Sequence, residues 1–242
     1  MLTGANTARI GRAFFGLMSG SYMAIELYWG SGSPYSWRVL LALEFKRLRY
    51  ESHLLDLSQQ EHKSADMLKL NPRGRVPVLK DGDYVCHESL AILSYLDRKY
   101  PEYPLFGSTP EAHGNIMRRI CEYRVYVEDH LNRIIATIFF GALEARLEEV
   151  TKSLDIVITE ARHIEQRLTQ AEWLATDTCS AADLMVFPSI KILQRALARR
   201  EADDLQTPFE PLEPNFPAIA AWLRRMEALP GYERTYPPHW RA

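Results

Sequence analysis

The chain has 242 residues, of which 47% are hydrophobic, which is enough to bury one large core or two smaller ones. Its 29 basic and 31 acidic side chains give a formal net charge of −2, so it has no excess of positive charge to attract a nucleic-acid backbone. No run of about 18 apolar residues occurs, so no membrane span is predicted.

Cysteine usage indicates the compartment. Cys86, Cys121 and Cys179 are widely spaced and form no CxxC pair, and histidines do not cluster near them. This pattern predicts neither a disulfide framework nor a metal site. We therefore expect a cytoplasmic protein that holds no metal and binds neither nucleic acid nor a membrane.

Residues 1–22 precede the first strand-like segment. Their apolar run, residues 13–18, is short for a secretory signal peptide, and Met23 stands directly before the strand pattern. We interpret residues 1–22 as a flexible N-terminal extension.

Residues 23–102 change pattern every ten to fifteen positions, in the order strand, helix, strand, short helix, two strands, helix. Asp81-Gly82 separates the last two strands and is a strong hairpin signal, since both central positions favour positive φ. A strand–helix–strand unit followed by a hairpin predicts a mixed four-stranded sheet. The predicted segments are residues 24–29, 34–46, 50–57, 64–70, 76–87 and 88–100.

Residues 103–110 end a proline-rich stretch and read as a linker, after which the strand patterns stop. Residues 111–242 carry apolar positions at helical spacing. Ser180 stands three residues before Asp183, which is a capping-box arrangement. The sequence therefore predicts an α/β domain followed by an all-helical bundle, with helices over residues 111–140, 146–168, 181–200 and 217–229.

Four motifs occur in order along this pattern: "SPYSWRV" (33–39), "NPRGRVPVL" (71–79), "ESLAILSYL" (88–96) and "SAAD" (180–183). With the element order, they resemble the cytosolic glutathione S-transferase family, nearest to its serine-type tau, theta and zeta classes. The resemblance implies a thioredoxin-like N-terminal domain and an enzyme that conjugates glutathione, its co-substrate, to a hydrophobic electrophilic small molecule or reduces a peroxide. It also implies a homodimer.

Ser33 has two predicted roles. A serine before proline is a common helix N-cap, with the proline at the first helical position. The resemblance implies that its hydroxyl also stabilises the glutathione thiolate, because an ordinary thiol with a pKa of about 8.5 is mostly protonated at pH 7. Tyr28, near the position of the hydroxyl in tyrosine-type members, is the competing candidate, while Ser31 and Ser36 are expected to be structural.

Glu88 and Ser89 begin a predicted helix, where free N–H groups and the helix dipole attract anions. The resemblance implies that Glu88 holds the γ-glutamyl ammonium and that Ser89 holds the γ-glutamyl carboxylate. It further implies a cis bond between Val76 and Pro77, which exposes the Val76 backbone to the cysteinyl unit of glutathione.

The resemblance implies further contacts with glutathione and with the second substrate. Arg75 and Lys63 align with positions that meet the glycyl carboxylate in tau-like members, although a lone basic residue is usually a solvated surface charge. The second substrate is expected between the domains. Its predicted wall consists of Tyr35, Arg119, Tyr123 and Tyr126.

Two departures from related motifs narrow the chemistry. Omega-type members resemble "CPY", with cysteine where this chain has Ser33, so disulfide exchange is not expected. Zeta-type isomerases resemble "SSCSWR", which differs from "SPYSWR" here and weakens a maleylacetoacetate-type isomerase as an alternative. A second alternative is a non-catalytic scaffold or stress-regulatory interaction protein with the same fold.

Overall fold

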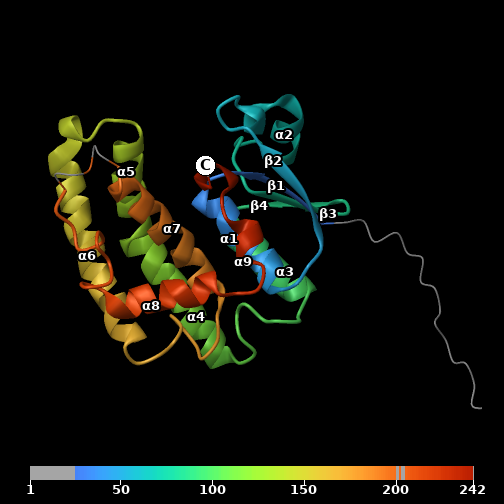
Figure 1. Cartoon of the computed structure of the whole chain (residues 1–242). Coiled ribbons are helices and arrows are strands. Elements are labelled where there is room, and N and C mark those ends of the chain that lie inside the picture. The colour runs from blue at the N-terminus through green and yellow to red at the C-terminus, as the bar shows by residue number, and fades with distance from the viewer. Residues whose placement is uncertain (1–24, 200–201, 203–204, 242) are drawn as a thin grey trace, which may run out of the picture.

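The computed structural model describes residues 25–199, 202 and 205–241 (Figure 1). It consists of an α/β domain beside a group of long helices (Figure 1). The predicted flexible extension, residues 1–22, lies outside the described residues.

The α/β domain contains a four-stranded mixed sheet in the order β2-β1-β3-β4. β1 pairs in parallel with β2 and antiparallel with β3, and β3 pairs antiparallel with β4. This topology confirms the predicted mixed sheet of a thioredoxin-like domain. The strands are β1 (Ile25–Gly30), β2 (Tyr50–Leu55), β3 (Val78–Asp81) and β4 (Tyr84–His87).

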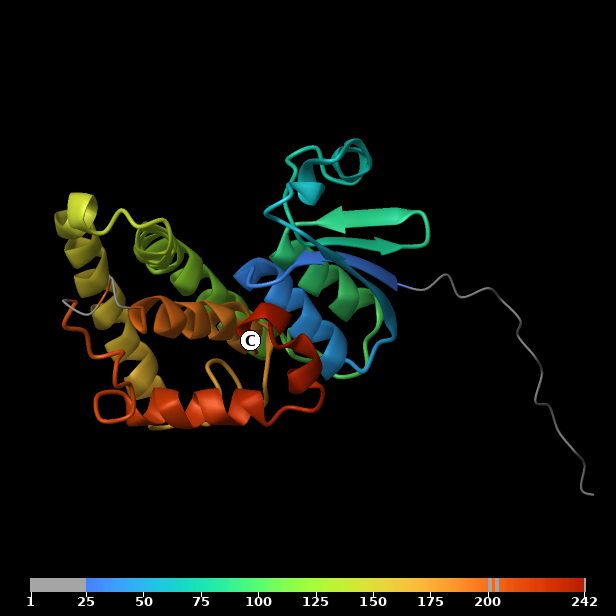
Figure 2. The same cartoon turned by 45° about the horizontal axis from the view of Figure 1, so that its top comes forward.

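Helices α1 (Pro34–Phe45) and α3 (Ser89–Lys99) lie on one side of the sheet, and α2 (Ala65–Leu70) lies on the other (Figure 2). Leu27 on β1 and Leu79 on β3 are register partners, and both are fully buried. They belong to the apolar core that the helices complete. The core therefore fixes the strand ends that carry the polar residues of the site.

The helical domain is built around α7 (Ala181–Leu197), which is buried along most of its length and packs against α1, α4 and α5. The other helices present apolar faces to it or to each other. They are α4 (Pro110–Tyr126), α5 (Glu128–Phe139), α6 (Leu147–Leu168), α8 (Pro217–Glu227) and α9 (Tyr232–Thr235), with short 3₁₀ turns η2 (Glu144–Arg146) and η4 (Pro238–Trp240). A further 3₁₀ turn, η1 (Glu61–Lys63), lies in the α/β domain between β2 and α2.

The predicted continuous helix over residues 111–140 is wrong, because the structure divides it at Val127 into α4 and α5. Val127 has φ −123° and ψ −47°, yet its N–H still bonds to Tyr123 O at 3.0 Å and its carbonyl accepts from Leu131. Neither proline nor glycine marks the bend. The buried apolar residues keep their helical spacing through it, so the sequence pattern gives no sign of a break. The bend lies directly before Glu128, which pairs with Arg38 on α1 at 2.7 Å.

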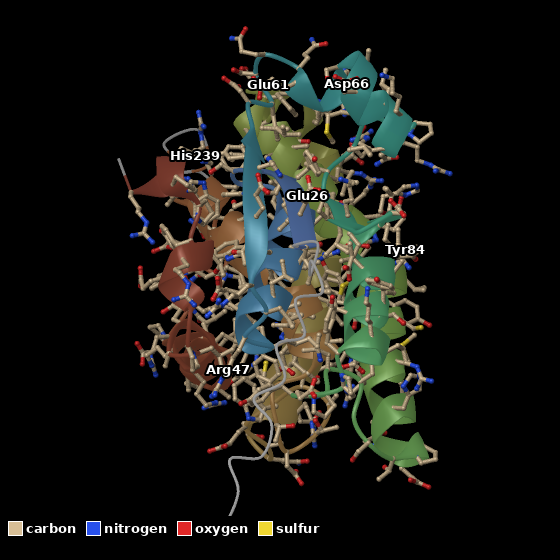
Figure 3. The ribbon with its side chains drawn as sticks, turned by 90° about the vertical axis from the view of Figure 1, so that its right-hand side faces the viewer. Glu26, Arg47, Glu61, Asp66, Tyr84 and His239 are labelled. Carbon is tan, nitrogen blue, oxygen red and sulfur yellow. The ribbon has the colours of Figure 1, made fainter. Side chains whose placement is uncertain are left out.

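The segment from α9 to η4 returns to the α/β domain, which the sequence pattern did not predict (Figure 1). Trp37 on α1 donates from its indole Nε1 to Thr235 Oγ1 at 2.9 Å, and its ring meets Trp240 edge to face. His239, labelled in Figure 3, has its Nδ1 2.6 Å from Ser31 Oγ. This C-terminal segment therefore covers the side of α1 next to the turn that carries Ser33.

Candidate functional site

Ser33 occupies the junction between β1 and α1. Its N–H bonds to Gly30 O at 3.2 Å, and the turn uses Gly32 at φ 80°, a conformation that favours glycine. Ser33 is the N-cap of α1, and its Oγ accepts from the Ser36 N–H at 3.2 Å. Because this bond uses only an acceptor site, the hydroxyl proton is free to donate to another group.

A cavity of about 510 Å³ opens at this junction, a size suited to a small-molecule ligand. Six of the seven residues predicted to bind glutathione or its thiolate line it. These are Ser33, Arg75, Val76, Pro77, Glu88 and Ser89.

The start of α3 forms one wall of the cavity. Glu88 is its N-cap residue with φ 71°, a left-handed conformation that is uncommon for a residue with a side chain. Ser89, at the first helical position, is buried and lines the cavity with Glu88. An acid and a helix N-terminus thus stand side by side, which suits a ligand that carries both an ammonium and a carboxylate.

The loop before β3 forms the adjoining wall, because Val78, which follows Pro77, pairs with His87, which precedes Glu88. The Val76–Pro77 peptide bond is cis, as the resemblance implies. Asn71 braces this loop, because its Nδ2 donates to Arg75 O at 2.8 Å and its Oδ1 accepts from the Arg73 N–H at 3.1 Å. The buried Asn71 side chain therefore fixes the backbone of this loop, which lines the same cavity as Ser33.

Basic residues gather at the end of the cavity next to this loop. Arg73 and Arg75 line it together with His62 on η1, whereas Lys63, the next residue, is not among its lining residues. His62 and Arg73 were not predicted. Arg73 stands inside the "NPRGRVPVL" motif, which could have indicated it, while nothing in the sequence distinguishes His62 from its neighbours.

A second cavity of about 750 Å³ adjoins the first and extends between α3 and α4. Tyr35, Glu88, Ser89 and Glu128 belong to the walls of both cavities. Tyr35 also accepts a hydrogen bond at 2.9 Å from Asn132 Nδ2 on α5. Side chains from both domains therefore form one continuous wall.

The predicted second-substrate residues lie in different places. Tyr35 lines the cavities, whereas Tyr123 is buried, and its hydroxyl donates to Ser189 Oγ at 2.7 Å. Burial raises the pKa of Tyr123 to about 12. Arg119 pairs with Glu122 at 2.8 Å beside a separate hollow.

Tyr126 is exposed and borders that same hollow between α4 and α6, away from Ser33. In the cavities beside Ser33, the wall from the long helices includes instead His113, Met117 and Arg124 on α4 and Glu128 on α5. The sequence pattern could not separate the faces of α4, because an aromatic or basic residue at helical spacing fits a core, a cavity wall and an exposed face alike.

Tyr28, the competing candidate, is engaged elsewhere. Its hydroxyl donates to Glu26 Oε2 at 2.7 Å, and its ring stacks on His53 at 4.4 Å; Glu26 is labelled on the sheet in Figure 3. Burial and the neighbouring Glu26 carboxylate raise the pKa of Tyr28 to about 12. Such a phenol is a poor stabiliser of a thiolate, and Tyr28 is not among the lining residues of either cavity.

Among residues 25–199, 202 and 205–241, no group of three or more histidine, cysteine or acidic side chains is arranged to hold a metal ion. Within the same part of the chain, no helix combines the length and apolar character needed to cross a membrane.

Comparison with known proteins identifies both domains. The family model described as "Glutathione S-transferase, N-terminal domain" matches residues 32–99, and "Glutathione S-transferase, C-terminal domain" matches residues 127–230. Glutathione S-transferase A of Pleuronectes platessa is 30% identical over 221 residues, covering 89% of this chain and 92% of the relative.

Two solved structures extend this similarity. A glutathione S-transferase from the Antarctic clam Laternula elliptica is 31% identical, with a TM-score of 0.71 and coverage of 90% of this chain and 94% of that chain. Glutathione S-transferase-I bound with lactoylglutathione is 26% identical, with a TM-score of 0.73 and coverage of 88% and 98%. The chain therefore belongs to the glutathione S-transferase family.

Proposed function

We propose that this protein is a glutathione transferase that binds glutathione in the 510 Å³ cavity and stabilises its thiolate with the hydroxyl of Ser33. The observation that carries the proposal is the meeting of Ser33, Glu88 and Ser89 in one cavity with the cis Val76–Pro77 bond. Family membership and the lactoylglutathione complex of a relative support the same ligand class.

Each part of glutathione has a proposed partner. The Glu88 carboxylate receives the γ-glutamyl ammonium, and Ser89 donates to the γ-glutamyl carboxylate from its hydroxyl and N–H. The Val76 backbone pairs with the cysteinyl unit. Arg75 attracts the glycyl carboxylate, aided by Arg73 and His62 at the same end of the cavity and by the predicted Lys63 next to it.

The chemistry follows from the position of Ser33. Lowering a thiol pKa by about two units takes ~2.7 kcal/mol of selective stabilisation of the anion. One hydroxyl donor supplies most of this free energy, and the N-terminus of α1 adds about 0.3–1 kcal/mol. The released proton goes to solvent, and the sulfur attacks an electrophilic carbon, where the new C–S bond forms as the leaving group departs with its electron pair.

The second substrate is proposed to be a hydrophobic electrophile that lies against Tyr35, between the two domains. Tyr35 is fixed by Asn132 on its hydroxyl and by Arg38, whose guanidinium carbon is 4.6 Å from the ring centroid. A rigid aromatic wall beside the thiolate suits a planar apolar molecule. A panel of aryl halides, epoxides, peroxides and maleyl compounds would identify the reacting class and would reveal isomerase activity.

Calorimetry with glutathione tests the proposal directly. We expect saturable binding with one glutathione per chain, because one cavity contains six of the seven predicted partners. Glu88→Gln should weaken binding by roughly tenfold, because the γ-glutamyl ammonium would lose its charged partner. An exposed acid away from the cavity, Asp66, provides the matched control, Asp66→Asn. Absence of binding heat would favour the non-catalytic scaffold.

We further propose a cytoplasmic homodimer. Cys86, Cys121 and Cys179 are all free thiols, which suits a reducing compartment. Val125 and Tyr126 expose apolar surface on α4. Sedimentation at micromolar concentration should therefore give twice the mass of one chain, and a single species of monomer mass would contradict the dimer.

A further inference from the structure

Arg38, in the middle of α1, is a buried cation at the boundary between the two domains. Its exposed fraction is 1%, and its Nη2 lies 2.7 Å from Glu128 Oε1 on α5. A buried ion pair is costly unless its remaining donors are satisfied. The other contacts of Arg38 therefore show what the buried charge is used for.

The guanidinium group donates to both domains. Nη2 lies 3.1 Å from Tyr123 Oη and 3.4 Å from Ser189 Oγ, and Nε lies 3.1 Å from Met185 O, all in the helical domain. Nη1 lies 3.5 Å from Ser89 Oγ at the start of α3. Arg38 thus connects the proposed γ-glutamyl site to the helical domain.

The contact with Ser89 determines which way its hydroxyl points. Arginine has no acceptor, so Ser89 Oγ must accept from Arg38 and its proton must point to another group. Ser89 lines the cavity, where the proposed ligand group is a carboxylate. At 3.5 Å the bond is long, so its main effect is orientation and a positive field at Ser89 rather than bond strength.

Arg38 touches two further residues of the cavity walls. Its guanidinium lies over the ring of Tyr35, and it holds the carboxylate of Glu128. Lys46, the C-cap residue of α1, is a second buried cation with which Arg38 can be compared. Lys46 is also buried, but its ammonium bonds to Asp97 and to two backbone carbonyls, and none of these groups lines either cavity.

We propose that Arg38 is a positioning residue that presents the Ser89 hydroxyl to the γ-glutamyl carboxylate and holds Tyr35 and Glu128 in the wall beside it. The inference rests on the proposed function and adds a residue to that site. It makes the affinity for one carboxylate of glutathione depend on a side chain that lines the adjoining 750 Å³ cavity and not the 510 Å³ cavity itself.

The test compares two ligands by calorimetry. Glutathione carries the γ-glutamyl carboxylate, and γ-aminobutyryl-cysteinyl-glycine lacks it. Arg38→Gln should weaken glutathione binding about tenfold, the equivalent of one charge-assisted hydrogen bond. Binding of the analogue should change by less than about twofold, because the group that Arg38 serves is absent. A purely structural role would weaken both ligands equally, and that result would overturn the inference.

Two further variants serve as a backup and as a control. Arg38→Lys keeps the charge but loses the planar fork, so it should show the same selective loss, and it carries the test if Arg38→Gln does not fold. Lys46→Met removes the matched buried cation and should leave both affinities unchanged.

In a Ser89→Ala background, Arg38→Lys should add no further selective loss, because the two residues act on one carboxylate. Independent, additive losses would contradict the inference. If the unaltered chain binds the analogue and glutathione with equal affinity, the γ-glutamyl site and the inference both fail. If it discriminates between them but Arg38→Lys does not alter that discrimination, only the inference fails.

Discussion

Ser33→Ala is expected to lower turnover at pH 6.5–7 by roughly 10- to 100-fold while changing glutathione affinity little. Without the hydroxyl donor, the pKa of the bound thiol returns toward ~8.5, so only a few per cent remains ionised near neutrality. The loss is smaller than the full change in ionised fraction, because a thiolate of higher pKa is more nucleophilic. It should shrink as the pH rises above the pKa of the unassisted thiol. Rate profiles against pH and the ultraviolet absorbance of the bound thiolate measure both effects.

Controls separate catalysis from capping. Ser33→Gly removes the hydroxyl at a capping cost of only a few tenths of a kcal/mol, so it should lose turnover while α1 stays intact. Ser31→Ala removes the neighbouring hydroxyl of the same turn, and Tyr28→Phe removes the phenol that is bonded to Glu26. Both should retain turnover. Normal activity in Ser33→Ala, or its loss in Tyr28→Phe, would reassign the thiolate partner.

Asp183→Ala is expected to lower the free energy of unfolding by about 3–5 kcal/mol. Asp183 is fully buried and accepts four hydrogen bonds. The donors are the N–H and hydroxyl of Ser180, both at 2.9 Å, the Leu174 N–H at 3.0 Å and Trp222 Nε1 at 2.9 Å. Alanine would leave all four donors buried without a partner, and urea unfolding curves measure the loss.

Thr109→Ala is the matched control, because Thr109 is also an N-cap, at the start of α4, and accepts a single bond from the Ala112 N–H at 3.2 Å. Its loss should be about 1 kcal/mol or less. Equal destabilisation in the two variants would show that the buried network around Asp183 adds nothing beyond an ordinary cap.

Local signals predicted most of the fold. Period-2 and period-3.6 patterns, the Asp81-Gly82 hairpin and the Ser180–Asp183 box all depend on residues that lie close together in sequence, and the structure contains each of them. The bend at Val127 was missed because neither proline nor glycine marks it, and the pairing of the next residue, Glu128, with Arg38 joins positions 90 residues apart. Contacts between residues so far apart produce no periodic pattern in the sequence.

The same distinction applies to the site. Ser33, Glu88 and Ser89 could be predicted because each stands at a helix start that the sequence marks. Apart from Tyr35, the wall formed by side chains of the helical domain could not be predicted, since an aromatic or basic residue at helical spacing fits a core, a cavity and an exposed face equally well. Tyr123 and Tyr126 are only three positions apart, yet one is buried and the other is exposed.

The C-terminal segment has a consequence for biosynthesis. Trp37 lies in the first helix of the α/β domain, but its partner Thr235 is synthesised 198 residues later. When residues 25–110 of a nascent chain have emerged from the ribosome, all four strands of the sheet are available. Trp37 on the first helix still lacks its ring contact with Trp240. Domains that emerge first usually fold first. In this protein, the contacts of Trp37 with Thr235 and Trp240 therefore form only after the C-terminal segment has left the ribosome.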